Sequence, residues 1–303
     1  MSSIVTIEER IVRLKKERNA IILAHNYQLP EIQDIADVTG DSLELARLAS
    51  QNDADVIVFC GVDFMAETAA IVNPDKTVLL PAKDAGCPLA EMADAQSLVA
   101  KKKEYPDAAV VCYVNSSAEV KAESDICCTS ANAVDVVNSL KEDRVLFVPD
   151  QNLASWVARH TEKEIIPWNG YCITHHRVRA EEVHRAKEAH PDAVVVVHPE
   201  CPAEVVDLAD EVASTTGILR YVKNSSAQKF IIGTEMGLLH RLMKENPGKV
   251  FFILSPGLVC PNMKKISSIQ MVLDALESNA PQVRVDEEIR LKALAAVERM
   301  LAI

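Results

Sequence analysis

Three kinds of residue recur along this 303-residue chain with nearly the same spacing. They are polar residues at His25, Tyr113 and His198, hydroxyls at Ser42, Ser130 and Thr215, and cysteines at Cys87, Cys172 and Cys260. The polar residues and the hydroxyls advance by 88 and then 85 residues, and the cysteines by 85 and then 88. Because three residue classes share one period, we expect three repeated units of domain size, longer than the repeats of solenoid proteins.

Short runs rich in Val and Ile alternate with helical patterns along the chain. Nine runs are continuously apolar, as is typical of strands buried on both faces of a parallel sheet. They are Ala20–Leu23, Asp55–Phe59, Thr77–Leu80, Ala109–Val114, Asp125–Cys128, Arg144–Val148, Ala193–Val197, Phe230–Ile232 and Val250–Leu254. This alternation predicts an α/β fold with mostly parallel sheets. With the period, it predicts three similar small parallel-sheet α/β domains arranged with pseudo-threefold symmetry around a central active site.

Local signals place helices between the strands. The Asp41–Glu44 segment has a capping-box pattern, and Pro30 and Pro202 stand where a first helical residue is expected. Residues Ala180–His190 carry apolar positions at helical spacing. The last forty residues, Lys264–Ile303, predict two helices without a strand.

The period also predicts where the repeated units begin and end. We expect units at residues 1–86, 87–171 and 172–263, with the helices of residues 264–303 packed on the first unit.

The composition narrows the class of protein. The chain has 32 Lys and Arg against 44 Asp and Glu, a formal charge of −12, which argues against nucleic acid or an anionic membrane as a partner. Its 49% of apolar residues can form a large core. No apolar run approaches the ~18 residues of a membrane span. Met1–Arg18 mixes charges of both signs, unlike a signal peptide, so we expect a cytoplasmic protein.

The eight cysteines predict a reducing compartment, because a chain of this size needs no disulfides and we expect no secretory signal. The chain contains no CxxC pair, which argues against a zinc ribbon or a thioredoxin-like site. Five are expected in the core or near it, at Cys60, Cys112, Cys127, Cys128 and Cys201. The three periodic cysteines lie in loops that contain glycine, where backbone can approach a ligand closely. Three thiols without an obvious fourth ligand suit a metal centre with an open position, either iron–sulfur or zinc. Three ordinary buried thiols are the alternative.

The polar clusters each follow a predicted strand, and ligands of α/β sheets bind beyond the carboxyl ends of strands. We therefore expect the periodic residues to surround one cavity. The three hydroxyls there could form part of an anion site, or act only as helix N-caps. One of His175 and His176 is expected to reach the cavity and the other to face solvent. The chain has no P-loop, GxGxxG, HExxH or GxSxG motif, which argues against a nucleotide enzyme, a zinc protease and a serine hydrolase.

Proton transfer is assigned to residues of the polar clusters. His198 and Glu200 are two residues apart, so their side chains face the same way in an extended stretch. An acidic neighbour is expected to raise the pKa of His198. Glu200 could instead only favour the start of the following helix. Tyr27 and Tyr113 could donate protons through their hydroxyls, or be structural.

Twelve segments, spread over nearly the whole chain except the terminal helices, resemble the quinolinate synthase family of bacterial NAD biosynthesis. They are AHNYQ (24–28), GDSLELA (40–46), GVDFMAETA (61–69), AGCPLAEM (85–92), YVNSSAEVKAESD (113–125), CTSANA (128–133), PDQNLA (149–154), GYCITHH (170–176), HPEC (198–201), STTGI (214–218), GTE (233–235) and CPNMK (260–264). HPEC or YVNSSA alone would only be suggestive, whereas the full set is very specific.

The resemblance implies a three-domain enzyme, a transferase, with a 4Fe–4S cluster held by Cys87, Cys172 and Cys260 and one iron open to substrate. It implies the condensation of iminoaspartate with dihydroxyacetone phosphate to quinolinate, phosphate and water. It also implies a functional link to an aspartate-oxidising enzyme that supplies iminoaspartate. The substrate-binding residues carried over by motif are His25, Ser42, Tyr113, Asn115, Ser130, His198, Glu200 and Thr215. Tyr27, His198 and Glu200 are the expected catalytic residues.

Two other classes of protein remain open at this point. One is a zinc enzyme with a three-cysteine site and a bound water, such as a hydrolase. The other is a non-catalytic redox or iron sensor with the same open cluster. In one respect the chain departs from some family members, which carry a CxxC pair at the last ligand. Here Cys260 stands alone, so a disulfide switch at that position is not available.

Overall fold

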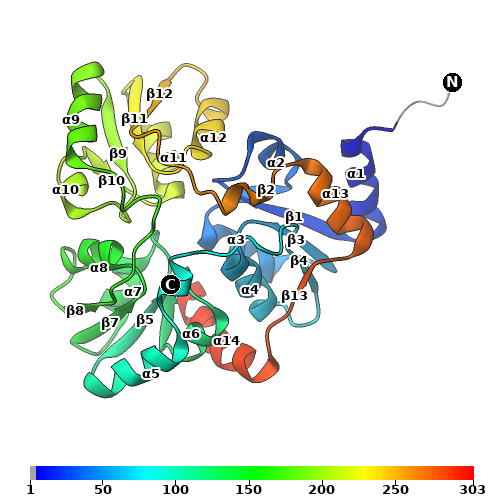
Figure 1. Ribbon diagram of the computed structural model, residues 1–303, viewed down its shortest axis with the longest axis horizontal. Coiled ribbons are helices and arrows are strands. Elements are labelled where there is room, and N and C mark those ends of the chain that lie inside the picture. Colours follow the sequence, from blue (N-terminus) through cyan, green and yellow to red (C-terminus); the bar gives the residue numbers. More distant parts are fainter. Residues whose placement is uncertain (1–4) are drawn as a thin grey trace.

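The computed structural model describes residues 5–303. Residues 1–4, and with them the start of the Met1–Arg18 segment, lie outside the described part. Three groups of strands and helices surround the centre of the molecule in Figure 1. Each group contains one sheet, so the expected architecture of three similar α/β domains is confirmed.

The thirteen strands of the described chain form three sheets. They are β1 (Ala20–His25), β2 (Val38–Gly40), β3 (Val56–Cys60), β4 (Thr77–Leu79), β5 (Ala109–Tyr113), β6 (Ile126–Cys128), β7 (Arg144–Val148), β8 (Glu164–Pro167), β9 (Val194–Val197), β10 (Glu211–Val212), β11 (Lys229–Gly233), β12 (Val250–Ile253) and β13 (Gln282–Val283).

Helices connect these strands and cover the sheets. They are α1 (Ile7–Glu17), α2 (Pro30–Ile35), α3 (Ser42–Gln51), α4 (Asp63–Val72), α5 (Ala95–Glu104), α6 (Ala118–Ala122), α7 (Ala133–Ser139), α8 (Gln151–Ala158), α9 (Ala180–Ala189), α10 (Ala203–Val206), α11 (Thr215–Asn224), α12 (Leu238–Glu245), α13 (Ile269–Ser278) and α14 (Glu287–Leu301), with short 3-10 turns η1 (Ala90–Met92) and η2 (Met263–Lys265).

The three sheets share one strand order. They read β2-β1-β3-β4, β6-β5-β7-β8 and β10-β9-β11-β12, with β13 added outside β4 in the first sheet. Every pair except β13–β4 is parallel. Because the order repeats, equivalent strands of the three units end at equivalent places, which is the structural counterpart of the period in the sequence.

All nine predicted strands are present, and four further strands were not predicted from the sequence. The missed strands β2, β8, β10 and β13 are two to four residues long. Each of them is short and contains a polar residue, glycine or proline, so it shows no continuous apolar run, and pairing with a neighbouring strand decides its conformation. β13 corrects the expectation that residues 264–303 contain no strand.

The predicted helix signals are found, with differences of one residue at two helix boundaries. The Asp41 carboxylate caps α3 and Glu44 completes the capping box, and Pro30 is the first residue of α2. The predicted helix over Ala180–His190 is α9, which ends one residue earlier. Pro202 is the N-cap of α10 and not its first residue.

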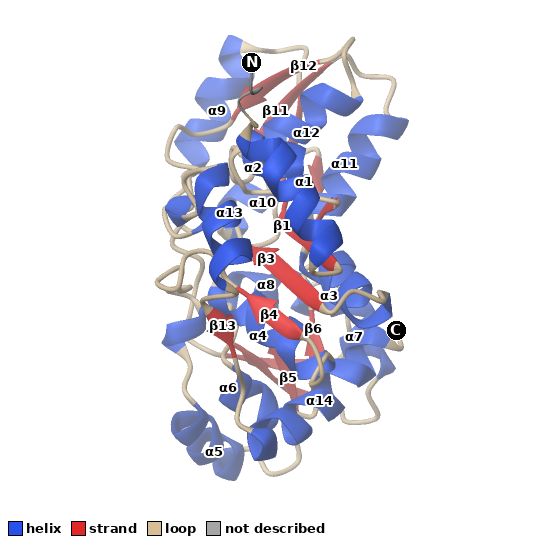
Figure 2. Ribbon diagram, turned by 90° about the vertical axis from the view of Figure 1, so that its right-hand side faces the viewer, coloured by secondary structure: helices blue, strands red, loops and turns tan. Residues whose placement is uncertain are grey.

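The two C-terminal helices pack against different parts of the molecule. Helix α13 lies on α1, at the first sheet. Helix α14 lies mainly against α6 and β6 of the second unit, with a smaller contact to α4, and Figure 2 shows it close to β6. The C-terminal segment therefore connects the first two units. Among residues 5–303, no helix combines the length and apolar character that crossing a bilayer requires.

Candidate functional site

A central cavity of about 80 Å³ lies where the three units meet. All twelve residues singled out in the sequence line it: His25, Tyr27, Ser42, Cys87, Tyr113, Asn115, Ser130, Cys172, His198, Glu200, Thr215 and Cys260. The structure thus brings together residues that are up to 235 positions apart in the sequence. What each residue does there remains a prediction.

The shared strand order explains why the period gathers these residues. In each unit the polar cluster follows the first strand, the hydroxyl follows the second and the cysteine follows the fourth. These strands are parallel, so their carboxyl ends lie at one edge of each sheet. Three such edges face the same cavity.

The three cavity cysteines differ from the other five in their exposure. Cys87, Cys172 and Cys260 are partly exposed, whereas the remaining cysteines are buried, as expected for core thiols. Backbone N–H groups point toward all three cavity sulfurs, for example those of Leu89 and Ala90 toward Cys87. N–H groups directed at a sulfur stabilise a thiolate that is bound to a metal.

The cavity thiols are neutral unless a cation binds them. Burial raises the pKa of Cys87 to about 12, and the nearby Cys260 acts in the same direction. Burial also raises the pKa of Cys172 and of Cys260. A thiolate ligand requires loss of this proton, and a bound metal would supply the compensating charge. The donor set therefore fits a thiolate-bound metal centre.

A second, more compact set of possible ligands lies beside Cys172. The ligand atoms of Cys172, His175 and Glu200 are all within 4.8 Å of one another. His175 Nδ1 is 2.7 Å from Glu200 Oε2 and 3.3 Å from Cys172 Sγ. Two ligands of one tetrahedral zinc ion, each ~2.1 Å from the metal, would be roughly 3.4 Å apart. At 2.7 Å, the nitrogen and oxygen instead share a hydrogen bond.

Glu200 lies between two imidazoles at the cavity wall. It is buried, with Oε2 2.7 Å from His175 Nδ1 and 3.4 Å from His198 Nδ1. Burial acts to raise the pKa of Glu200, but the imidazoles of His198 and His175 outweigh this effect and hold the pKa below its usual range. Glu200 is therefore a carboxylate near neutral pH and can accept a proton.

The expectation that His198 has a raised pKa is wrong, although the Glu200 carboxylate does act in the predicted direction. Burial lowers the pKa of His198 to about 3 and outweighs the opposing effect of the Glu200 carboxylate. Burial and His198 likewise lower the pKa of His25 to about 3. Both histidines share a single carboxylate, and its favourable effect on a charged imidazole is smaller than the cost of desolvation. Both imidazoles are neutral near pH 7 and act as hydrogen-bond partners.

A chain of hydrogen bonds joins a tyrosine of the first unit to Glu200 of the third. Tyr27 Oη is 2.6 Å from Thr234 Oγ1, which is 2.9 Å from His175 Nε2. His175 Nδ1 then contacts Glu200. Neither Thr234 nor a role for His175 in this chain was predicted. Thr234 lies two residues after the predicted strand Phe230–Ile232, and its place near a strand end could have indicated it.

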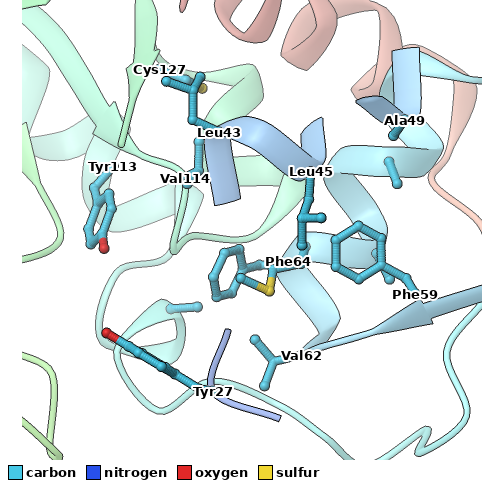
Figure 3. Close-up of a cluster of buried hydrophobic side chains, with 14 of the residues drawn as sticks. Tyr27, Leu43, Leu45, Ala49, Phe59, Val62, Phe64, Tyr113, Val114 and Cys127 are labelled. Atoms are coloured by element: carbon cyan, nitrogen blue, oxygen red, sulfur yellow. The ribbon is translucent and has the colours of Figure 1, made fainter. Parts of the chain in front are cut away.

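The two cavity tyrosines present their hydroxyls to the same space. Figure 3 shows the oxygens of Tyr27 and Tyr113 on the side of the apolar cluster that faces away from Phe59 and Leu45. Burial, reinforced by the Glu200 carboxylate, raises the pKa of Tyr27 and of Tyr113. Both phenols therefore keep their protons near neutral pH and can donate them.

The cavity hydroxyls are not the N-caps of the helices beside them. Asp41 caps α3 and Ser214 caps α11, so Ser42 and Thr215 are first helical residues. In the second unit Asn132 occupies the N-cap position of α7, and Ser130 Oγ lies 3.1 Å from His198 Nε2. The N-cap alternative is therefore wrong for these three hydroxyls. His175 is the cavity histidine of its pair, while the half-buried His176 contacts Asn152.

Two buried polar atoms at the cavity have no partner among the described residues. They are Asn115 Oδ1 and Glu200 Oε1. Buried polar atoms are nearly always hydrogen-bonded, so each exception calls for an explanation. Both atoms are acceptors, so a ligand that donates hydrogen bonds in the cavity would satisfy them.

One enclosed space contains neutral imidazoles, a buried carboxylate, protonated phenols and three accessible thiols. This combination is typical of the active site of an α/β enzyme and includes a candidate metal centre. A family model described as quinolinate synthetase A protein matches residues 9–302 of the chain. The quinolinate synthase of Methanoregula boonei is 61% identical over 303 residues, covering 100% of both chains. Those of Alkaliphilus metalliredigens and Thermodesulfovibrio yellowstonii are 59% and 58% identical, covering 97% and 98% of both chains. This chain belongs to the quinolinate synthase family and is an enzyme of that class.

Proposed function

We propose that this enzyme condenses iminoaspartate with dihydroxyacetone phosphate and releases quinolinate, phosphate and water, as a step of NAD biosynthesis in the cytoplasm. The proposal rests mainly on one observation. A single cavity contains three accessible thiols, the hydrogen-bond chain from Tyr27 through Thr234 to His175, and polar atoms without a partner. Family membership supports the overall reaction.

Both proposed substrates are anions, and the cavity offers them donors although the chain carries a charge of −12. Ser42 and Thr215 stand at the first turns of α3 and α11, beside backbone N–H groups that favour anions. The hydroxyls of Ser42, Ser130 and Thr215 and the amide of Asn115 are assigned to hold carboxylate and phosphate oxygens. His25, His198 and Tyr113 complete the proposed binding set.

Cys87, Cys172 and Cys260 are the proposed ligands of a 4Fe–4S cluster. Cys172 is the only one of them in the compact ligand set, so their sulfurs are spread more widely than the ligands of one metal ion. A cluster of several irons suits that spacing better than zinc. When bound, a cluster with one open iron supplies a Lewis acid to a substrate oxygen.

The proton transfers of the reaction fall to Tyr27, His198 and Glu200, with Thr234 and His175 between the tyrosine and the carboxylate. Tyr27 holds a proton to donate, and Glu200 can accept one. Thr234 Oγ1 contacts both Tyr27 and His175, so a proton can pass along the chain without entering solvent. The buried His198 is neutral and orients Ser130 and Glu200.

The proposed substrates imply a supplier in the cell. Iminoaspartate forms when the amine of aspartate is oxidised, so we propose a functional link to an aspartate-oxidising enzyme. We also propose that residues 1–86, 87–171 and 172–263 are the three domains, with residues 264–303 joining the first two.

The test is an assay for quinolinate with anaerobically purified protein, iminoaspartate and dihydroxyacetone phosphate, with iron, sulfide and zinc measured on the same sample. We expect quinolinate and about four irons per chain. Stoichiometric zinc without sulfide would identify a zinc enzyme instead. A full cluster without quinolinate formation would identify a redox or iron sensor.

A further inference from the structure

An acidic residue follows the third strand of each sheet, a fourth periodic position that the sequence analysis did not single out. These residues are Asp63 after β3, Asp150 after β7 and Glu235 after β11. They are 87 and then 85 residues apart, close to the spacing of the cysteines. The fourth strand, which leads to the cysteine, pairs directly with the third in every sheet. Each acidic residue therefore stands next to a cysteine loop.

In the second unit this carboxylate holds the backbone of a cysteine. Asp150 is fully buried, and its Oδ2 accepts a hydrogen bond of 3.1 Å from the backbone N–H of Cys172. Its Oδ1 accepts bonds of 2.8 Å from the N–H groups of Asn152 and Leu153 at the start of α8. One rigid carboxylate thus ties the cysteine loop to the end of a helix.

The third unit repeats the arrangement with a different residue. Glu235 is fully buried, and its Oε1 accepts a hydrogen bond of 3.1 Å from the backbone N–H of Cys260. Its Oε2 accepts a bond of 2.6 Å from Gly237 N–H, and Lys264 Nζ lies 3.1 Å from Oε1. Lys264 also donates to the backbone carbonyl of Tyr27, so Glu235 links the cysteine loop to the proposed proton donor.

The first unit has the acidic residue but a different contact. Asp63 Oδ1 accepts from the N–H of Phe64, at 2.7 Å. Its backbone N–H donates to the carbonyl of Ala85, two residues before Cys87, at 2.9 Å. Asp63 therefore supports its cysteine loop through the backbone, and only two of the three carboxylates bind a cysteine amide directly.

We propose that Asp150 and Glu235 are positioning residues that fix Cys172 and Cys260 in the geometry required by the metal centre. This inference rests on the ligand set of the proposed function. A metal-binding loop loses less conformational freedom on binding when its backbone is already held, and groups behind the ligands are known to affect metal retention strongly. In both Asp150 and Glu235, each of the two carboxylate oxygens accepts a hydrogen bond from at least one backbone N–H.

The test measures iron release to a chelator from anaerobically purified holoenzyme, comparing wild type with D150N and E235Q. Each amide keeps the shape of the side chain but retains only one acceptor oxygen, so one of the backbone N–H contacts is lost. We expect iron release about tenfold faster or more in both variants, with a changed visible absorption spectrum of the bound centre. The matched control is D94N, the same change at another capping aspartate, which binds Ser97 N–H at the start of α5 and no cysteine loop. It should release iron as wild type does.

The outcomes separate this inference from the proposed function. Suppose that wild type contains the expected iron, and that E235Q and D150N release it at the wild-type rate with an unchanged spectrum. This result would overturn the positioning role but not the proposed function. If D150N does not fold, E235Q decides, since Glu235 caps no helix. Equally fast release in D94N would also overturn the positioning role, because the effect would then be general. Wild-type protein without iron and sulfide would refute the proposed cluster, and the positioning role with it.

Discussion

At the scale of single residues, Glu200 shows how burial decides the protonation of this site. The carboxylate is 3% exposed, yet its pKa lies below the usual range, because at low pH the neighbouring His198 takes up a proton first and its positive charge then opposes protonation of Glu200. The same burial keeps His198 neutral. The site therefore holds one deprotonated carboxylate, Glu200, next to phenols that retain their protons. Opposite protonation states side by side are what general acid–base catalysis requires.

Replacing Glu200 by Gln should separate catalysis from binding. The amide keeps the shape of the side chain but cannot accept the proton, so we expect turnover to fall by roughly 10²-fold or more. Iron content and quinolinate affinity should stay close to wild type. E204Q, an exposed change in the first turn of α10, is the control and should be neutral. Wild-type turnover of E200Q at full iron content would move the acid–base role to Tyr27 or His25.

The exposure of the cysteines gives a second prediction at the residue scale. C172A should abolish the broad visible absorption of an iron–sulfur centre, because it removes a proposed ligand. C112A should leave the absorption unchanged, since Cys112 is a fully buried core thiol of β5. Absorption spectra and iron content of the two anaerobically purified variants provide the measurement. A full cluster in C172A would contradict the ligand assignment.

At the scale of the elements, two neighbouring residues at the start of a helix have different roles: one caps the helix and the other lines the cavity. Ser214 caps α11 through the N–H of Gly217, while Thr215 beside it lines the cavity. Asp41 and Ser42 divide the same tasks at α3. Because the cap is supplied by the preceding residue, the cavity hydroxyl is free to contact a ligand. At α3 the capping-box pattern already placed the cap at Asp41, but at α11 the division could not be read from the sequence, where Ser214 and Thr215 are both suitable N-caps.

The pair at α11 allows the two tasks to be tested independently. T215A should weaken quinolinate binding by about 1.5–3 kcal/mol, the contribution of a hydrogen bond to a charged group. S214A should instead lower the free energy of unfolding by about 1 kcal/mol through loss of the cap. Calorimetric titration and denaturant unfolding measure the two quantities. If T215A binds quinolinate as tightly as wild type, Thr215 has no part in the anion site.

At the scale of the whole molecule, the site depends on how closely the three units approach one another. Gly237, at the start of α12 in the third unit, packs against the backbone of Tyr27 in the first. A Cβ at position 237 would lie 2.7 Å from the carbonyl carbon and oxygen of Tyr27. No other residue than glycine fits there without movement of the loop that carries the proposed proton donor.

G237A should therefore affect both stability and catalysis. We expect a loss of roughly 1–3 kcal/mol in the free energy of unfolding, as for overpacking in a core, and lower turnover because Tyr27 moves away from Thr234. The matched control is G248A, where an added Cβ meets no atom within 4 Å; it should stay within about 0.5 kcal/mol of wild type. Unchanged stability and turnover in G237A would show that the contact between the two units is easily rearranged.

Much of the architecture was predictable because it repeats. Nine of the strands appear as continuous apolar runs in the sequence. The common period of the hydroxyls, polar clusters and cysteines indicated one shared cavity before its geometry was known. Short strands such as β10 and β13 left no signal, since pairing with neighbours decides them. The acidic positions at Asp63, Asp150 and Glu235 were overlooked because Asp and Glu are common and do not share one residue type.

The sequence by itself determined the three α/β units, the edge at which their functional residues gather and the family to which the chain belongs. These follow from local patterns and from spacing along the chain, which need no knowledge of contacts. Only the tertiary structure decided the pKa of His198, the hydrogen-bond chain through Thr234 and His175, and the carboxylates behind Cys172 and Cys260. Desolvation and hydrogen bonding depend on what surrounds an atom in space, and those surroundings come from distant parts of the chain.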